Sequence, residues 1–205
     1  MYKRQAYNPQ AIIEQTSQFD FYDGGGLDAS FLGLAQTDAH GNVNVSKFNG
    51  RPVGCGGFVN ITRATRKLVF CGTFTAGGLK VAVEGGQLQI LNEGQVRKFI
   101  DQVEQITFNG SDAARREQDV LFVTERAVFR LRADGLELTE VAPGIDIERD
   151  ILAHMAFRPH MPNVRLMDAD IFKPRWGGLA AALHADANPP TATAKATVAA
   201  SGSPV

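Results

Sequence analysis

The sequence predicts an α/β fold: an open sheet with mixed strands and glycine-rich loops, whose first βα units are missing. Many short apolar runs alternate with turn residues. Helical patterns are few in the early part of the chain, although parallel strands normally have a helix between them. Glycine accounts for 21 of the 205 residues, and 15 of these glycines lie between Gly24 and Gly94. Such a cluster is typical of tight turns or of a ligand cradle.

The strands are predicted from apolar runs that are bounded by turn residues. Lys67–Cys71 is the clearest buried strand, and residues 27–36 are predicted as another buried strand with a glycine inside it. Residues 19–22 and 103–108 are β-prone and are predicted as short strands. Glu84-Gly85-Gly86 predicts the turn of a hairpin. Three later runs are predicted to form a meander: residues 120–124, 127–131 and 136–141.

Two helices and three segments complete the predicted organisation. Residues 58–65 predict one or two helical turns, and Asp146 is the predicted N-cap of a later helix. The apolar face of that later helix carries Ile147, Ile151, Leu152 and Met155. Residues 1–18 are expected to be a non-native start and a connecting segment, residues 19–179 the domain, and residues 180–205 a disordered tail rich in Ala, Thr and Pro.

Composition and charge exclude several classes of function. The formal net charge of −1 predicts no binding to nucleic acid or to an anionic membrane. No apolar run is long enough to span a bilayer. The two cysteines, Cys55 and Cys71, lack CxxC spacing and fit a reduced, cytoplasmic protein. The four histidines lack metal-ligand spacing, so no metal site is expected, and the absence of GxSxG gives a hydrolase triad no support.

Three glycine-rich segments are candidate ligand loops: residues 24–26, 54–57 and 72–78. Consecutive backbone N–H groups can bind an anion, and the second loop leads into a predicted helix, where free N–H groups suit a phosphate or a developing oxyanion. Each loop also has a plainer interpretation. The first is a sharp loop that packs against a helix, the second is the turn that begins a helix, and the third is a turn between strands.

Two further side chains are candidate nucleophiles. A cysteine nucleophile needs a basic partner that lowers the pKa of its thiol; His40 is the only histidine near Cys55 in sequence and no third orienting group is evident, so a small buried residue is the preferred interpretation. Glu84 lies beside glycines, but a glutamate in a hairpin turn is by default solvated.

Taken together, the glycine segments resemble the C-terminal, β-type half of a family I coenzyme A transferase, most closely the single-chain acetate/propionate branch. Five motifs in order carry the resemblance: GGGLD at 24–28, LGLAQTD at 32–38, GNVN at 41–44, GCGG at 54–57 and TAGG at 75–78. VEQITFNG at 103–110 and the FRL…GLEL segments, which begin at Phe129, extend it. The resemblance runs from about Phe19 to Leu179 and implies a partial NagB/RpiA-like sheet.

The resemblance also implies a mechanism. A glutamate in a Glu-x-Gly motif attacks an acyl-CoA thioester, and CoA then returns to form a glutamyl-CoA thioester, from which an incoming short-chain carboxylate such as acetate or propionate takes the CoA. Gly57 is implied as the backbone oxyanion donor. CoA-binding positions are implied at Gly54, Gly56, Gly77 and Gly78. Coenzyme A is then a substrate, no cofactor is held permanently, and the complete enzyme is a homo-oligomer.

One departure from the family pattern limits this expectation. No Glu-x-Gly motif occurs before Gly24, where the family carries its nucleophile. We therefore expect a fragment that lacks the nucleophilic glutamate and the N-terminal half, and that is inactive by itself. The alternative is a non-catalytic module that binds acyl-CoA or an anion.

Overall fold

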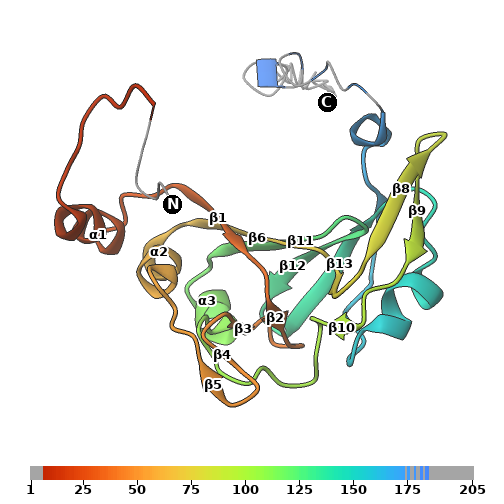
Figure 1. The fold of residues 1–205 in the computed structure, drawn as a ribbon, viewed down its shortest axis with the longest axis horizontal. Helices are drawn as coiled ribbons and strands as arrows, with labels where there is room; N and C mark the ends of the chain where they lie inside the picture. The colour runs from red at the N-terminus through yellow and green to blue at the C-terminus, as the bar shows by residue number, and fades with distance from the viewer. Residues whose placement is uncertain (1–6, 174, 176–177, 179–180, 182, 185–205) are drawn as a thin grey trace, which may run out of the picture.

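A six-stranded mixed sheet forms the centre of the computed structural model (Figure 1). The structure describes residues 7–173, 175, 178, 181, 183 and 184, so most of the predicted tail and residues 1–6 lie outside the described residues. The strand order is β1-β6-β11-β12-β13-β14. The strands are β1 (Ala29–Gly33), β6 (Lys67–Cys71), β11 (Asp119–Val123), β12 (Ala127–Arg132), β13 (Gly135–Val141) and β14 (Arg165–Leu166).

Parallel and antiparallel pairing meet inside this sheet. Strands β1, β6 and β11 are parallel to one another, whereas β11, β12 and β13 form an antiparallel meander and β14 runs parallel to β13. The predicted class, an α/β fold with mixed strands, is confirmed. Strand β6 and the three strands of the meander lie at the predicted residues, within one or two positions at their ends.

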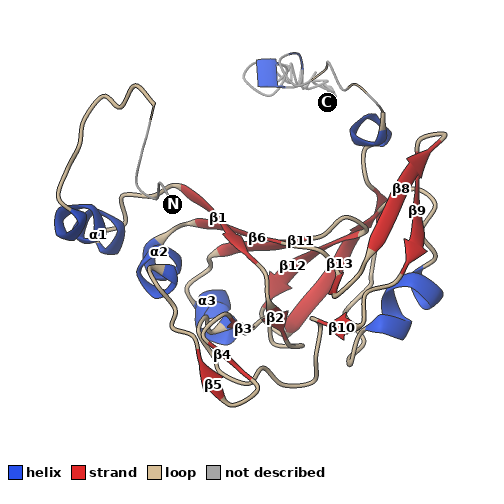
Figure 2. Ribbon diagram, in the orientation of Figure 1, coloured by secondary structure: helices blue, strands red, loops and turns tan. Residues whose placement is uncertain are grey.

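Short ladders and helices surround the sheet (Figure 2). The predicted hairpin is formed by β8 (Lys80–Glu84) and β9 (Gln87–Asn92). The other paired strands are β2 (Gln36–Thr37) with β3 (Val43–Asn44), β4 (Lys47–Phe48) with β5 (Arg51–Pro52), and β7 (Thr75–Ala76) with β10 (Val96–Arg97). The α-helices are α1 (Gln15–Asp23), α2 (Phe58–Ala64) and α3 (Gly110–Arg115). Short turns of other helix types are η1 (Ile147–Ile151), η2 (Leu152–His154) and η3 (Ala169–Phe172).

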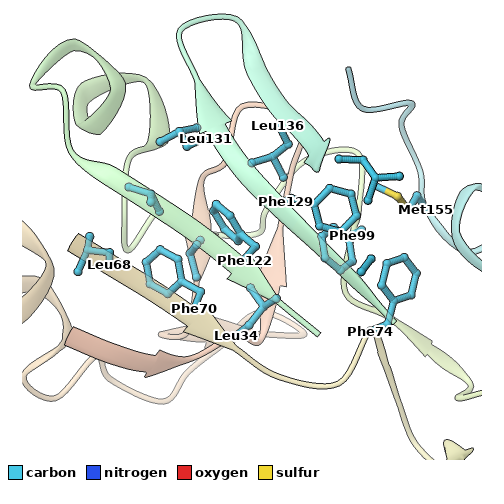
Figure 3. Packing of buried hydrophobic residues seen from close by; sticks show 14 of the residues in the cluster. Leu34, Leu68, Phe70, Phe74, Phe99, Phe122, Phe129, Leu131, Leu136 and Met155 are labelled. Carbon is cyan, nitrogen blue, oxygen red and sulfur yellow. The ribbon is translucent and has the colours of Figure 1, made fainter. Parts of the chain in front are cut away.

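The hydrophobic core covers one face of the sheet (Figure 3). Alternate residues of β6, β11, β12 and β13 point into it, as the period of two in a strand requires. Phenylalanines dominate: Phe70 lies 5.1 Å from Phe108 and 5.2 Å from Phe122 between ring centroids, and Phe99 lies 4.9 Å from Phe129. Each of these rings buries a large apolar area, so the core is the main source of stability.

The opposite face of the parallel strands is only partly covered by described residues. Phe31, Val69 and Leu121 lie side by side across β1, β6 and β11 in register. Phe31 is 74% exposed, and Val69 and Leu121 are partly buried. Parallel sheets are normally covered on both faces, so this apolar row is unusual for an isolated domain.

The prediction of a strand at residues 19–22 is wrong, because these residues belong to helix α1. A strand needs a neighbour with which to pair, whereas a helix satisfies its backbone locally. Here the N–H of Gly24 donates to the carbonyl of Asp20 at 2.9 Å and closes the helix. The aromatic side chains, which suggested a strand, instead pack along and beside the helix; Phe19 and Tyr22 meet edge to face at 5.4 Å.

Residues 103–108 do not form the predicted strand either. Val103 and Phe108 are both buried, although residues five apart in a strand would face opposite sides. The segment is irregular and makes only an isolated bridge between Phe108 and Val43. The carboxylate of Glu104 accepts a hydrogen bond from the backbone N–H of Asn49 at 2.8 Å, so the β4–β5 turn holds the segment in place.

The predicted buried strand at residues 27–36 is shorter and more exposed than expected. It divides into β1 and β2, and β1 is an edge strand with only one buried residue, Ser30. The later helix has the predicted N-cap, since the Asp146 carboxylate accepts from the N–H of Arg149 at 2.8 Å. It is, however, a π turn followed by a 3₁₀ turn rather than an α-helix.

Candidate functional site

The loop at residues 54–57 lies where helix α2 begins. Gly54 and Gly56 have φ values of +83° and +55°, which L side chains rarely adopt, so glycine is required there. Phe58, the first residue of α2, stacks on Phe70 at 5.7 Å near the end of β6. The loop therefore lies beside the carboxyl ends of β1 and β6, the edge where open α/β sheets bind their ligands.

The backbone N–H groups of this loop are available to a ligand. Gly54 N–H donates to the Ser46 carbonyl at 3.3 Å, whereas the N–H groups of Gly56 and Gly57 have no acceptor among the described residues. A Cβ added at Gly57 would lie 2.8 Å from the ring of Phe19, so the α1 helix packs directly against this glycine. The arrangement can present fixed backbone donors to an oxygen that develops negative charge.

A pocket of about 520 Å³ opens beside the loop. Cys55 and Phe58 line it from the loop and α2, Leu32 and Gly33 line it from β1, and Tyr22 lines it from α1. Cys55 is exposed, so the prediction that it is a small buried residue is wrong. It lies on the loop between two glycines, before α2 begins, and therefore contributes to the pocket wall rather than to the core.

Gly77 and Gly78 form the turn between β7 and β8. Both have positive φ, +76° and +100°. Their carbonyls are occupied: Gly77 accepts from the N–H of Gln95 at 3.1 Å, and Gly78 accepts from the amide of Asn92 at 2.7 Å. The pocket beside the loop at residues 54–57 does not have this turn among its lining residues.

The anion-binding interpretation of residues 24–26 is wrong. The three glycine N–H groups donate to carbonyls of helix α1, those of Asp20, Tyr22 and Phe21 respectively, at 2.9–3.1 Å. No free donor is left for a ligand, because the glycines satisfy carbonyls at the helix C-terminus. Glu84 is exposed at the β8–β9 hairpin, as expected of a solvated glutamate.

The structure contains a buried ionic cluster, centred on Arg126, that the sequence analysis did not predict. The Arg126 side chain is fully buried, and its guanidinium lies 2.6 Å from Glu93 and 2.7 Å from Glu125. It also donates to the Asp150 carbonyl at 2.9 Å and lies 4.9 Å above the ring of Phe74. Glu93 and Asp150 are distant from Arg126 in sequence, and the signal available was only the adjacent Glu125-Arg126 pair in an expected turn.

Glu93 links this cluster to the β7–β10 ladder. Its carboxylate accepts from the hydroxyl of Thr75 and from the N–H of Gly94. Burial by itself raises the pKa of Glu93, but hydrogen bonds from Arg126, Thr75 and Gly94 outweigh it and hold the pKa below its ordinary value. The ionised carboxylate is therefore favoured in the folded protein.

The lowered pKa of Glu93 predicts how stability depends on pH. A carboxyl group whose pKa is depressed by folding contributes stability above its unfolded pKa, about 4.3, and loses it as the pH falls through the folded value. We expect Glu93→Gln to lower the free energy of unfolding at pH 7, and this difference to shrink below pH ~4. Urea unfolding from pH 7 to pH 3 measures it. Glu84→Gln is the control, and a difference that stays constant with pH would contradict the prediction.

The chain is 52% identical over 166 residues to acetate CoA-transferase YdiF of Escherichia coli K12, which covers 80% of the chain and 31% of that protein. It is 46% identical over 180 residues to caffeate CoA-transferase of Acetobacterium woodii, covering 85% and 34%. The crystal structure of the acyl-CoA transferase YdiF apoenzyme from E. coli O157:H7 superposes with a TM-score of 0.80 at 51% identity, covering 82% of the chain and 33% of that structure.

The chain is similar to CoA-transferases over the part of their sequence that it matches. No family model matches it. It spans about a third of the length of the curated CoA-transferases that it matches. YdiF has also been solved as a thioester complex with CoA, and that structure superposes with a TM-score of 0.79. In the described part of the chain, no helix has the length and apolar character needed to cross a membrane.

Proposed function

We propose that the chain contributes the oxyanion-binding part of a CoA-transferase that moves coenzyme A from an acyl-CoA to a short-chain carboxylate such as acetate or propionate. The observation that carries the proposal is the pair of unoccupied N–H groups in the glycine loop at residues 54–57, in a chain 52% identical to an acetate CoA-transferase. Coenzyme A enters as a substrate. Gly54, Gly56, Gly77 and Gly78 are the proposed contacts to it.

The proposed chemistry passes through a glutamyl-CoA intermediate. A glutamate carboxylate attacks the thioester carbonyl, and CoA thiolate leaves to give an acyl-glutamyl anhydride. The thiolate then attacks the glutamyl carbonyl and releases the acyl carboxylate, which leaves CoA on the enzyme. Each attack places negative charge on a carbonyl oxygen, and the N–H of Gly57 is the proposed donor to that oxygen.

In this proposal the nucleophilic glutamate belongs to the part of the enzyme that corresponds to the remaining two-thirds of the relatives. Two features of the sheet support further chain packing here. Strand β1 pairs on one side only, so its outer edge presents unpaired backbone groups among the described residues. Parallel sheets are normally covered by protein on both faces, so the row formed by Phe31, Val69 and Leu121 is expected to pack against further chain.

A chimera tests the proposal. The matched third of YdiF is replaced by this chain, and formation of propionyl-CoA from acetyl-CoA and propionate is measured. We expect turnover from the chimera and none from the 205-residue chain by itself. Gly57→Pro in the chimera removes the N–H donor, and we expect kcat to fall about 10²–10³-fold. Gly57→Ala keeps the donor while adding the same Cβ, and is the matched control.

Each outcome decides between the two hypotheses. Turnover by the isolated chain would overturn the fragment proposal. An inactive chimera, together with calorimetric binding of acetyl-CoA by the isolated chain, would favour the alternative, a non-catalytic acyl-CoA-binding module. Equal loss of activity in Gly57→Pro and Gly57→Ala would show that space beside Phe19, and not the N–H donor, limits the reaction.

The uncovered edge predicts the behaviour of the isolated chain. Phe31→Arg places a charge on the exposed side of β1, and charges on edge strands oppose edge-to-edge association. We expect the unmodified chain to self-associate and the variant to do so much less, as measured by sedimentation velocity across a concentration series. Val53→Arg, at a similarly exposed residue on a loop, is the control. Equal association of all three proteins would contradict the prediction.

A further inference from the structure

The ammonium group of Lys98 lies beside the carboxyl ends of two neighbouring parallel strands, β1 and β6. Its Nζ donates to the carbonyl of Leu34, immediately after β1, at 3.0 Å. A Cβ built on Gly72, immediately after β6, would lie 3.1 Å from the same Nζ, so the absent side chain of that glycine makes room for the ammonium. Glu125, just after β11, acts on it electrostatically.

The backbone that carries Lys98 is firmly held. The Lys98 carbonyl accepts from the N–H of Thr37 at 2.8 Å, and the N–H of Ile100 donates to the Thr37 carbonyl at 2.9 Å. Phe99, between them, is fully buried and stacks on Phe74, with their ring centroids 4.7 Å apart. The lysine side chain therefore extends from a fixed base to the ligand-binding edge of the sheet.

The charge of Lys98 is poorly compensated. The side chain is partly buried, and no carboxylate of the described residues lies within ion-pair distance of it. Glu125, its charged neighbour, is already engaged: one oxygen accepts from the N–H of Phe74 at 2.8 Å and the other from Arg126 at 2.7 Å. Burial lowers the pKa of Lys98, and the more distant Glu125 raises it only in part. An anion at the ammonium would relieve this cost.

We propose that Lys98 is the counter-charge for the carboxylate of the acid substrate. This inference rests on the proposed CoA transfer, because it assigns to that reaction a group that holds the incoming acid. One partly covered ammonium offers a single positive charge beside Leu34 and Gly72, which matches a small monocarboxylate. The phosphates of CoA carry more charge than one ammonium neutralises. The glycine loop at residues 54–57 lies at the same edge of the sheet, as the stacking of Phe58 on Phe70 requires.

Lysine-selective NMR tests the inference directly on the 205-residue chain. The chain is labelled with 13C at lysine Cε, and the Lys98 signal is assigned by its absence in Lys98→Arg. The pKa of each lysine is measured in sodium chloride, sodium acetate and sodium phosphate at equal ionic strength. We expect acetate to raise the pKa of Lys98 saturably, by about one unit, because an adjacent opposite charge favours the ammonium form. The exposed Lys80 is the internal control and should not respond. Should self-association broaden the signals, the same titration is run in the Phe31→Arg variant, which adds no lysine.

Three results of this titration would overturn the inference. These are no response of Lys98 to acetate, an equal response of Lys80, or a response to phosphate that equals or exceeds the response to acetate. The last would assign the position to a phosphate. The test is independent of turnover, so an inactive chimera with a saturable acetate response would remove the transferase proposal and keep the carboxylate site. An active chimera in which Lys98→Gln leaves KM for propionate unchanged would remove the carboxylate site and keep the transferase proposal.

Discussion

Replacing Arg126 with methionine is expected to lower the free energy of unfolding by about 3–5 kcal/mol, because removal of one partner leaves a buried ion pair uncompensated. The carboxylates of Glu93 and Glu125 would lose the guanidinium that lies 2.6 and 2.7 Å from them. The Asp150 carbonyl would lose its donor as well. Methionine retains much of the apolar contact with Phe74, so the loss reports mainly on charge and hydrogen bonds.

Chemical denaturation of the variant, followed by circular dichroism, measures this loss. Arg130→Met is the matched control: Arg130 lies on the same strand, pairs with Asp119 and is about one-third exposed. An exposed pair of this kind contributes at most about 1 kcal/mol. If the two variants unfold at the same denaturant concentration, the buried cluster does not stabilise the fold as argued. Pairing Arg126→Met with Glu93→Gln should recover part of the loss, because the unpaired charge is then removed.

Gly110→Ala is the second change with a large expected effect, about 3 kcal/mol or more. A Cβ at this position would lie 2.1 Å from the carbonyl oxygen of His40 and 2.7 Å from the carbonyl carbon of Gly41. Both contacts are with backbone, so no side-chain rotation can relieve them. The Gly110 N–H also donates to the side chain of Asn42 at 3.0 Å, and this bond would be displaced together with the start of α3.

Thermal and urea unfolding of this variant measure the expected loss of stability. Gly33→Ala is the control, because a Cβ there meets nothing within 4 Å and the backbone is not left-handed. Alanine in place of a strand glycine is expected to change stability by no more than about 1 kcal/mol. A Gly110→Ala variant as stable as Gly33→Ala would show that the turn at residues 38–42 yields easily to the added methyl group.

The elements that the sequence predicted well are those whose pattern is local. Strand β6 and the β11–β12–β13 meander follow from continuous or alternating apolar residues, and the hairpin at Gly85 and Gly86 follows from turn chemistry. The N-cap at Asp146 was also predictable, because the capping carboxylate and its acceptor N–H are three residues apart.

The errors arose where a neighbour distant in sequence decided the outcome. Residues 19–22 are aromatic enough for a strand, but the described residues offer them no partner strand, and they fold as a helix that packs on Gly57. Residues 103–108 are held by the turn after β4 and by Val43, and neither contact is visible in their own pattern. Cys55 is exposed because its loop lines a pocket, although a small apolar residue is usually buried.

The sequence by itself determined the α/β class, the central strands and, through its ordered glycine motifs, the resemblance to CoA-transferases, because each depends on residues close together in the chain. Only the tertiary structure decided which glycine loops keep free N–H groups: those of residues 24–26 are used by α1, whereas those of Gly56 and Gly57 remain available. It alone also brought Arg126 to Glu93, and Lys98 to Leu34 and Gly72. Hydrogen bonding and charge compensation act over a few ångströms in space, and the chain folds together residues that its linear order keeps apart.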